Sequence, residues 1–293
     1  MIRRQRSGTI VAVVGAFVLF AVLACTFETI KGRFERTLQV TEQAEVDVTT
    51  GSGDIIVRVG EEQTVRIVGD ISVHYQRGGR DAAEEKLHQL ETHPPIEQND
   101  NVIRIGRIDD RALQRGVGIS YELTVPANTQ LRADSGSGDI DGTGLRAAVD
   151  AQTGSGSIRL VEVGAEVRAQ TGSGDIEITQ VGSGDVRAST GSGSIRASGL
   201  SGAVRASTSS GSITVEGKLS GPWELETGSG GITVRLPAAA AFELDAHTGS
   251  GEVHTNHPIT VVGSFDQGTL RGAVRGGGPR LIARTGSGSI RIE

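Results

Sequence analysis

The chain has 293 residues, which leaves room for one large domain or two of modest size. Glycine accounts for 43 residues and aromatic side chains for only 3%, so a thick core built on aromatic packing is excluded. With a net charge of −6, one Trp and two Tyr, the chain lacks the basic and aromatic residues that nucleic-acid-binding surfaces need. We therefore expect no nucleic acid among the partners.

Residues 1–30 have the pattern of an export signal or membrane anchor. Three arginines within the first six residues precede an uncharged, mostly apolar run that ends at Phe27. The run is also long enough to span a bilayer. The only cysteine, Cys25, follows Val22-Leu23-Ala24 and resembles the lipidation site of a bacterial lipoprotein. A lipoprotein, an uncleaved transmembrane anchor and a cleaved signal are all compatible with this pattern, and each places the remaining chain outside the cytoplasm.

Residues 34–126 contain strand signals without a fixed period, which predicts an N-terminal β-rich capping domain. Its one short helix is expected from Asp81 to Leu90, with Asp81 as the cap and Glu84 three positions later. A domain of this kind would cover the end of a repeat array. The expected strands lie at residues 46–48, 55–59, 64–68, 102–105 and 121–125.

From residue 131 to residue 293 the chain repeats a motif close to Thr-Gly-Ser-Gly-x-Ile. Successive copies are 18 to 21 residues apart; the last step is 37, which we interpret as two steps with one copy worn away. A fixed period of this size indicates a solenoid, in which each unit packs against its neighbours. The copies begin at Ser135, Thr153, Thr171, Thr190, Thr208, Thr227, Thr248 and Thr285, and a degenerate copy begins at Thr50.

Each repeat contains two short stretches in which apolar and polar residues alternate. Ile158 and Leu160 flank Arg159 in one of them, and Val167 and Ala169 flank Arg168 in the next. A period of two predicts half-buried strands, and the Gly/Ser segments predict corners where glycine supplies positive φ angles. The expected fold is therefore all-β, a parallel β-solenoid with two strands in each coil of about 18 residues.

Three features of the sequence resemble the DUF4097-type β-strand repeat proteins. They are Phe34-Glu-Arg-Thr-Leu38, Tyr121-Glu-Leu-Thr-Val-Pro126 and the recurring Thr-Gly-Ser-Gly-Asp-Ile, so the resemblance covers residues 34–293. It implies a β-solenoid on the bacterial envelope, in a family whose members are often labelled candidate adhesins. It supplies no catalytic residues.

No metal, cofactor or catalytic motif is predicted. The corners are similar in spacing to calcium-binding repeats, but the acidic residue stands one position too early and is serine in several coils. Three histidines are close in sequence, at His247, His254 and His257, yet the repeat places the first two on different strands. A carbohydrate-active enzyme would have to use acidic residues at the corners, of which Asp139, Asp175 and Asp185 are the candidates.

Outward side chains of successive coils should form rows about 4.8 Å apart. One row alternates in sign: Asp141, Arg159, Glu177 and Arg196. On the other face, three arginines follow one another without acidic partners between them: Arg168, Arg187 and Arg205. These three are either a solvated row or the binding strip for an anionic glycan or a partner's carboxylates.

The sequence favours a non-enzymatic, envelope-anchored solenoid with a scaffold, adhesion or envelope-sensing role; the alternative is a carbohydrate-active lyase or hydrolase. Expected partners are an anionic cell-wall glycan or an envelope protein, and the membrane through the N-terminal segment. The last strand, Ile290-Arg-Ile-Glu293, offers an edge that invites pairing. Either part of the segment from Val253 to Arg284 covers this edge, or the edge binds a second copy in end-to-end self-association.

Overall fold

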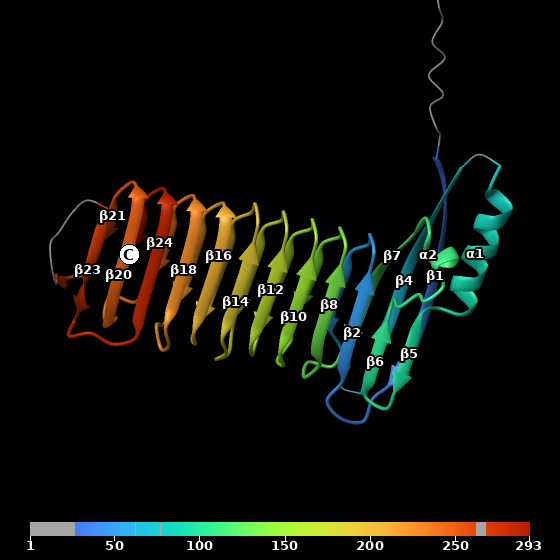
Figure 1. Ribbon diagram of the computed structural model, residues 1–293. Coiled ribbons are helices and arrows are strands. Elements are labelled where there is room, and N and C mark those ends of the chain that lie inside the picture. The colour runs from blue at the N-terminus through green and yellow to red at the C-terminus, as the bar shows by residue number, and fades with distance from the viewer. Residues whose placement is uncertain (1–26, 62, 77, 262–267) are drawn as a thin grey trace, which may run out of the picture.

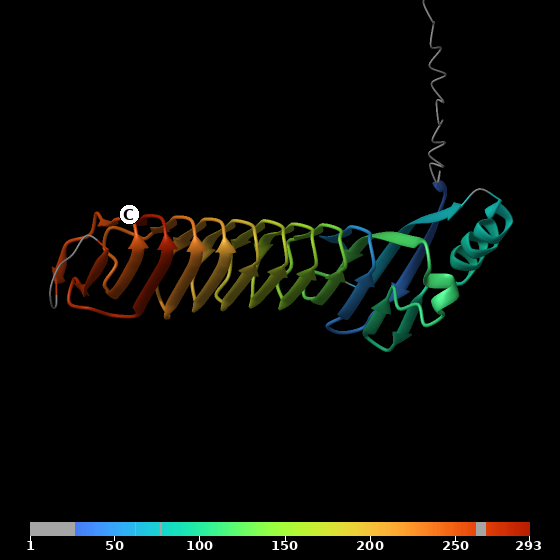
Figure 2. The same ribbon diagram turned by 45° about the horizontal axis from the view of Figure 1, so that its top comes forward.

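The computed structural model describes residues 27–61, 63–76, 78–261 and 268–293. Two facing sheets run along an elongated molecule, and strands follow one another along it like rungs (Figures 1 and 2). Most of the predicted signal or anchor segment, Cys25 included, lies outside the described residues. Within the described ranges, no helix combines the length and the apolar character of a membrane span.

The two sheets are named here sheet A and sheet B. Sheet A contains, in spatial order, β1 (Phe27–Gln39), β4 (Thr64–Gln76), β7 (Val117–Val125), β3 (Ile55–Val59), β9 (Ile140–Thr143), β11 (Ile158–Val163), β13 (Ile176–Gln180), β15 (Ile195–Leu200), β17 (Ile213–Gly217), β19 (Ile232–Arg235), β25 (Ile290–Ile292) and β21 (Val253–Thr255). Sheet B contains β22 (Ile259–Val261), β23 (Thr269–Val274), β20 (Phe242–Ser250), β24 (Arg280–Ser287), β18 (Trp223–Ser229), β16 (Val204–Ser210), β14 (Val186–Thr190), β12 (Val167–Thr171), β10 (Val149–Thr153), β8 (Gln130–Ser135), β2 (Glu45–Thr50), β6 (Val102–Ile105) and β5 (Ile96–Asn99).

The parallel solenoid with two strands in each coil is confirmed. Equivalent residues of successive coils pair in register, the motif isoleucines along sheet A and the valines of the second strand along sheet B. These side chains point between the sheets and are at most 3% exposed, for example Ile158, Ile176, Val167 and Val186. The core is thus a narrow aliphatic layer, repeated coil by coil.

The threonine of each motif joins neighbouring coils at the corner. The Thr153 hydroxyl donates to the carbonyl oxygen of Gly138 in the preceding coil at 2.8 Å, and it accepts from the N–H of Gly156 at 3.2 Å. Thr171 repeats both contacts with Gly156 and Gly174. Each threonine is buried, so its hydroxyl satisfies corner groups that water cannot reach.

The second glycine of the motif is required by close packing between coils. A Cβ on Gly156 would lie 2.0 Å from the carbonyl oxygen of Gly138, and one on Gly174 would lie 1.9 Å from that of Gly156. Neither residue has a positive φ, so the expected explanation by positive φ is wrong at these corners. It holds farther along the chain, at Gly211 and Gly230 (φ 157° and 145°).

The N-terminal region extends both sheets. In sheet A, β4 is antiparallel to both of its neighbours, β1 and β7, while β2 and β3 pair with β8 and β9 as a further coil. The sheets therefore run without interruption through the boundary expected at Pro126, and the division into residues 34–126 and 131–293 stays a prediction. All five expected strands are present; β1 and β5 were not predicted.

The expected helix is α1 (Arg80–Thr92), which packs against β1 and β4 through Ala83, Leu87 and Leu90. The predicted cap is wrong, because Gly79 occupies the N-cap position and no side chain caps the helix. Instead Arg80 pairs with Glu84 at 2.7 Å in the first turn. A second short helix that the sequence did not indicate is α2 (Arg111–Gln114), capped by Asp110, whose carboxylate accepts from the Ala112 N–H.

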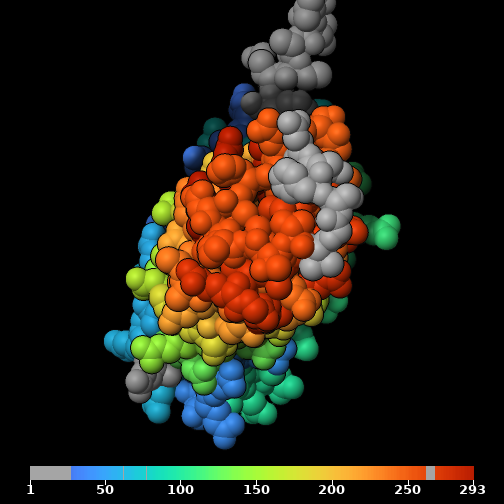
Figure 3. Space-filling model, turned by 90° about the vertical axis from the view of Figure 1, so that its left-hand side faces the viewer, coloured from blue at the N-terminus to red at the C-terminus, as the bar shows by residue number. Residues whose placement is uncertain are grey.

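At the C-terminal end, spatial order departs from chain order. Strands β24 and β25 lie between β18–β19 and β20–β21, so Leu281 pairs with both Trp223 and Leu244. The interpretation of the 37-residue step as two sequential coils is therefore wrong. The last coil is covered on both sides, as expected if a preceding segment shields its edge. The covering strands are β20 and β21, so the covering segment begins at Phe242 and not at Val253. Figure 3 looks onto this end, where C-terminal residues in orange and red form the surface.

The alternating row on sheet A has the predicted register, with Arg159 between Asp141 and Glu177. Its guanidinium lies 3.7 Å from the Glu177 carboxylate. Arg159→Glu would place three acids in one column, so we expect it to destabilise the fold by about 1 kcal/mol more than Arg159→Ala. Thermal unfolding of both variants measures the difference, which should shrink in 1 M salt. Equal melting temperatures at low salt would contradict the electrostatic role of the row.

Candidate functional site

A row of charged residues crosses the outer face of sheet B. Along most of this charged row the signs alternate. Like charges adjoin at one place in the described chain, where three arginines follow one another, and the uncharged Ile282 separates two acids near the C-terminal end. The three arginines are called the arginine run. In spatial order the charged row is Glu97, Arg104, Asp47, Arg132, Asp150, Arg168, Arg187, Arg205, Glu224, Ile282, Asp245 and Arg271.

The arginine run, Arg168, Arg187 and Arg205, is brought together as predicted but is not free of acidic partners. Arg187 lies 3.2 Å from the Glu166 carboxylate, and Arg205 pairs with Glu224. Arg168 has no ion pair with any described residue. All three are exposed. Like charges at this spacing repel by about 1 kcal/mol in water, a cost that the alternation avoids elsewhere in the charged row.

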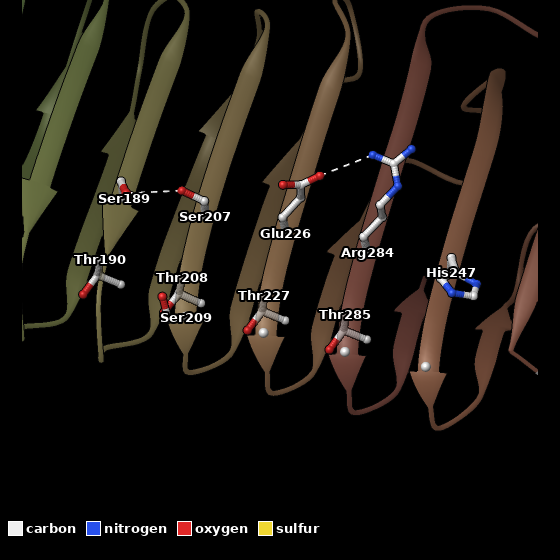
Figure 4. Close-up of a pocket in the computed structure, with 13 residues that line it drawn as sticks. Ser189, Thr190, Ser207, Thr208, Ser209, Glu226, Thr227, His247, Arg284 and Thr285 are labelled. Carbon is white, nitrogen blue, oxygen red and sulfur yellow. Dashed lines mark hydrogen bonds and ion pairs between the residues drawn. The ribbon is translucent and has the colours of Figure 1, made fainter.

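A second row lies two residues farther along the same strands. Its members next to the arginine run are uncharged, namely Gln170, Ser189 and Ser207, and the two serine hydroxyls are 3.2 Å apart. Two hollows of about 590 and 470 Å³ follow this polar row along the corner and meet at Ser189; together they are called the trough. Figure 4 shows the first of them. The full polar row is Asp134, Gln152, Gln170, Ser189, Ser207, Glu226, Arg284 and His247.

Buried threonines form the floor of the trough, and an ion pair lies at its far end. Thr190 and Thr208 lie along its floor, with their hydroxyls turned inward to corner carbonyls. At the C-terminal end, Arg284 bridges to Glu226 at 3.3 Å (Figure 4). The trough therefore presents hydroxyl and amide groups beside three guanidinium groups, an arrangement suited to a hydroxylated, anionic chain lying along the solenoid.

The corner carboxylates considered for an enzyme or a calcium site are engaged in the fold. Asp139 accepts from the N–H of Ser157 and Asp175 from that of Ser194, each at 2.7 Å, so each joins one coil to the next. Asp185 accepts from the Ala203 N–H at 3.0 Å. They occupy separate corners, Asp139 and Asp175 two coils apart and Asp185 beside the other sheet, and do not converge on a common point.

The three histidines are not brought together. His247 projects from sheet B into the trough, His254 lies on β21 of sheet A, and His257 is buried against the ring of Phe242 at 5.6 Å. In the residues that the structure covers, no group of three or more His, Cys, Asp or Glu is arranged to hold a metal ion.

Asp245 is the centre of a charge cluster at the C-terminal end. Its carboxylate, 12% exposed, lies 2.8 Å from Arg271, 3.1 Å from Arg280 and 3.8 Å from Arg284. Burial alone would raise the pKa of Asp245, but the hydrogen bonds and charges of these arginines hold it below its ordinary value. The cluster joins β20, β23 and β24. Sequence analysis missed it and the trough.

The fold and this face define a class: a two-sheet parallel β-solenoid with a long polar trough and an adjoining run of arginines. The family description Toastrack DUF4097 matches residues 97–293, more than half of the chain, so the chain belongs to this family. No protein of curated function matches the chain.

Solved structures with similarity to the chain come from bacterial proteins. A candidate adhesin from Bacteroides fragilis is 15% identical, with a TM-score of 0.38, over 89% of this chain and 97% of that chain. A candidate cell adhesion protein from Clostridium sporogenes is 12% identical, with a TM-score of 0.30, over 89% of this chain and 99% of that chain.

Proposed function

We propose that the chain is a non-enzymatic adhesion or scaffold protein of the cell envelope that binds a linear anionic glycan along the outer face of sheet B. The observation that carries this proposal is the arginine run, the one place in the described charged row where like charges adjoin. A ligand with carboxylate or phosphate groups would offset their repulsion. The hydroxyl and amide groups of the trough, two residues away on the same strands, would hydrogen-bond the sugar hydroxyls.

The anchoring part of the proposal rests on the sequence of residues 1–30. Strand β1 begins at Phe27, so an anchor ending there would hold the solenoid by its N-terminal end. The 13 strands of sheet B then reach roughly 58 Å, at about 4.8 Å for each step. A rod attached at one end displays a lateral face to polymers of the cell wall, which suits adhesion or scaffolding.

The enzyme alternative is less well supported. Asp139, Asp175 and Asp185 hold neighbouring coils together through backbone N–H groups, and a general acid or base needs a carboxyl within reach of the substrate. Glu226 in the trough is paired with Arg284. Both arrangements favour holding a ligand over transforming it.

The test is binding of the full chain, in detergent micelles, to immobilised polygalacturonate at low salt. The triple variant Arg168→Ser, Arg187→Ser, Arg205→Ser should bind at least about tenfold more weakly, since three exposed charge contacts are lost. Its matched control is Arg159→Ser, Arg196→Ser, Arg291→Ser, which removes the same charge from the opposite face. Equal loss in both variants would show non-specific attraction, and undiminished binding in the first would remove the arginine run from the contact.

A further inference from the structure

The C-terminal coil, residues 280–292 of β24 and β25, occupies a slot between two coils that precede it in the chain. On one side it pairs with β18 and β19, and on the other with β20 and β21. Every one of these ladders is parallel and in register. The slot is therefore formed by residues 223–235 and 242–255. These residues alone form the acceptor for the C-terminal coil, which contributes nothing to the walls of the slot.

The coil that closes the slot matches the coil that fills it at six of ten aligned positions. The segment from Leu244 reads Leu-Asp-Ala-His-Thr-Gly-Ser-Gly-Glu-Val, and that from Leu281 reads Leu-Ile-Ala-Arg-Thr-Gly-Ser-Gly-Ser-Ile. The two agree at the buried leucine, alanine and threonine and at the corner residues. Either coil can thus stack on β18 and β19, so the remaining chain stays closed when the C-terminal coil leaves.

The charges on the neighbouring strands favour the arrangement in which the C-terminal coil fills the slot. If β20 stacked directly on β18, Asp245 would adjoin Glu224 in the charged row. In the observed order Ile282 separates the two acids. Arg284 then lies 3.3 Å from Glu226 and 3.8 Å from Asp245, paired on both sides. The acceptor therefore selects a coil with this charge pattern, which any copy of the chain carries.

The connection between β23 and the C-terminal coil is short and strained. Arg275, Gly276 and Gly277 have φ angles of 52°, 89° and 86° in succession, and a positive φ is unfavourable for arginine. Gly278 and Pro279 follow directly. Short connections under strain favour the exchange of an element between molecules, because opening the connection relieves the strain.

We propose that two copies of this chain exchange their C-terminal coils, each filling the slot of the other. The exchanged dimer keeps every ladder and ion pair of the single molecule, and the connecting segments extend. The contact joins the two solenoids at their ends that lie away from β1. This inference does not depend on glycan binding.

Cysteine pairs can report which molecule fills the slot. Ser229 and Ser287 are exposed, in-register neighbours on β18 and β24, at a spacing that a disulfide accepts. Chains carrying only Ser229→Cys and only Ser287→Cys, both with Cys25→Ser, are co-expressed with different tags and oxidised. We expect a disulfide between the two chains. The control pair is Ser210→Cys with Ser229→Cys, neighbours on β16 and β18 that exchange leaves within one molecule, and it should give none.

One further variant makes a negative result informative. A single chain with both Ser229→Cys and Ser287→Cys should form its internal disulfide in the unexchanged molecule, which shows that the slot geometry is correct. If this variant closes while the co-expressed pair yields no mixed disulfide, exchange does not occur. A mixed disulfide of equal yield in the control pair would also overturn the proposal, since random collision would then explain both.

Discussion

Gly174→Ala should destabilise the protein by more than about 3 kcal/mol, at the upper limit of the usual cost of overpacking. The added methyl would lie 1.9 Å from the carbonyl oxygen of Gly156, 2.5 Å from its carbon and 2.8 Å from the nitrogen of Ser157. All three are backbone atoms, so no side-chain rotation relieves the contact and the stack itself must open.

The matched control is Gly51→Ala, at the first glycine of the degenerate motif. A Cβ there meets nothing within 4 Å and the residue has no positive φ, so the change should be nearly neutral. Chemical denaturation followed by circular dichroism compares the two variants. If Gly174→Ala lost no more stability than Gly51→Ala, the coils would be spaced more widely than described.

Asp245→Asn should loosen the C-terminal end and lower stability by about 2 kcal/mol near neutral pH, because three arginines lose their common carboxylate. The folded-state pKa of Asp245 is lowered, so the stabilisation is fully present above the ordinary carboxyl value of about 3.9. It is lost as pH falls through the folded-state pKa.

Melting temperatures of the parent and of Asp245→Asn, measured between pH 7 and pH 3, test this expectation. The gap between the two proteins should be constant down to about pH 4 and should narrow below it. Comparing the two proteins removes the contribution of the other carboxylates. A gap that stays constant through pH 3 would show that ionisation of Asp245 does not hold the end together.

The repeat made most of the solenoid predictable. A strict period of two in each strand and nearly constant spacing between motifs determine which side chains face inward, so the register of Arg159 between Asp141 and Glu177 followed directly. The reason for the corner glycines did not follow. Local sequence suggests a turn conformation, whereas the constraint at Gly156 is the carbonyl of a residue in the preceding coil.

The order of the last coils could not be predicted from local preference. The motifs at Thr248 and Thr285 are equivalent in every residue that decides strand or corner, and only the charges around Asp245 and Arg284 distinguish their places. The trough could not be predicted for a related reason. Ser189 and Ser207 look like ordinary small polar residues until stacking places them beside each other in one row.

Because successive corners are built in the same way, the number of coils, and with it the length of the solenoid, can change by deletion or duplication of whole repeats. Removing residues 154–171 would join Thr153 to Gly172, an exact substitute for Gly154 in the motif, and both strand ladders would continue in register. The molecule would shorten by one step of about 4.8 Å. No compensating substitution is needed at either end, because the non-repeating strands there contact only their nearest coils. Related chains can therefore diverge in reach by whole coils while keeping the same base and the same tip.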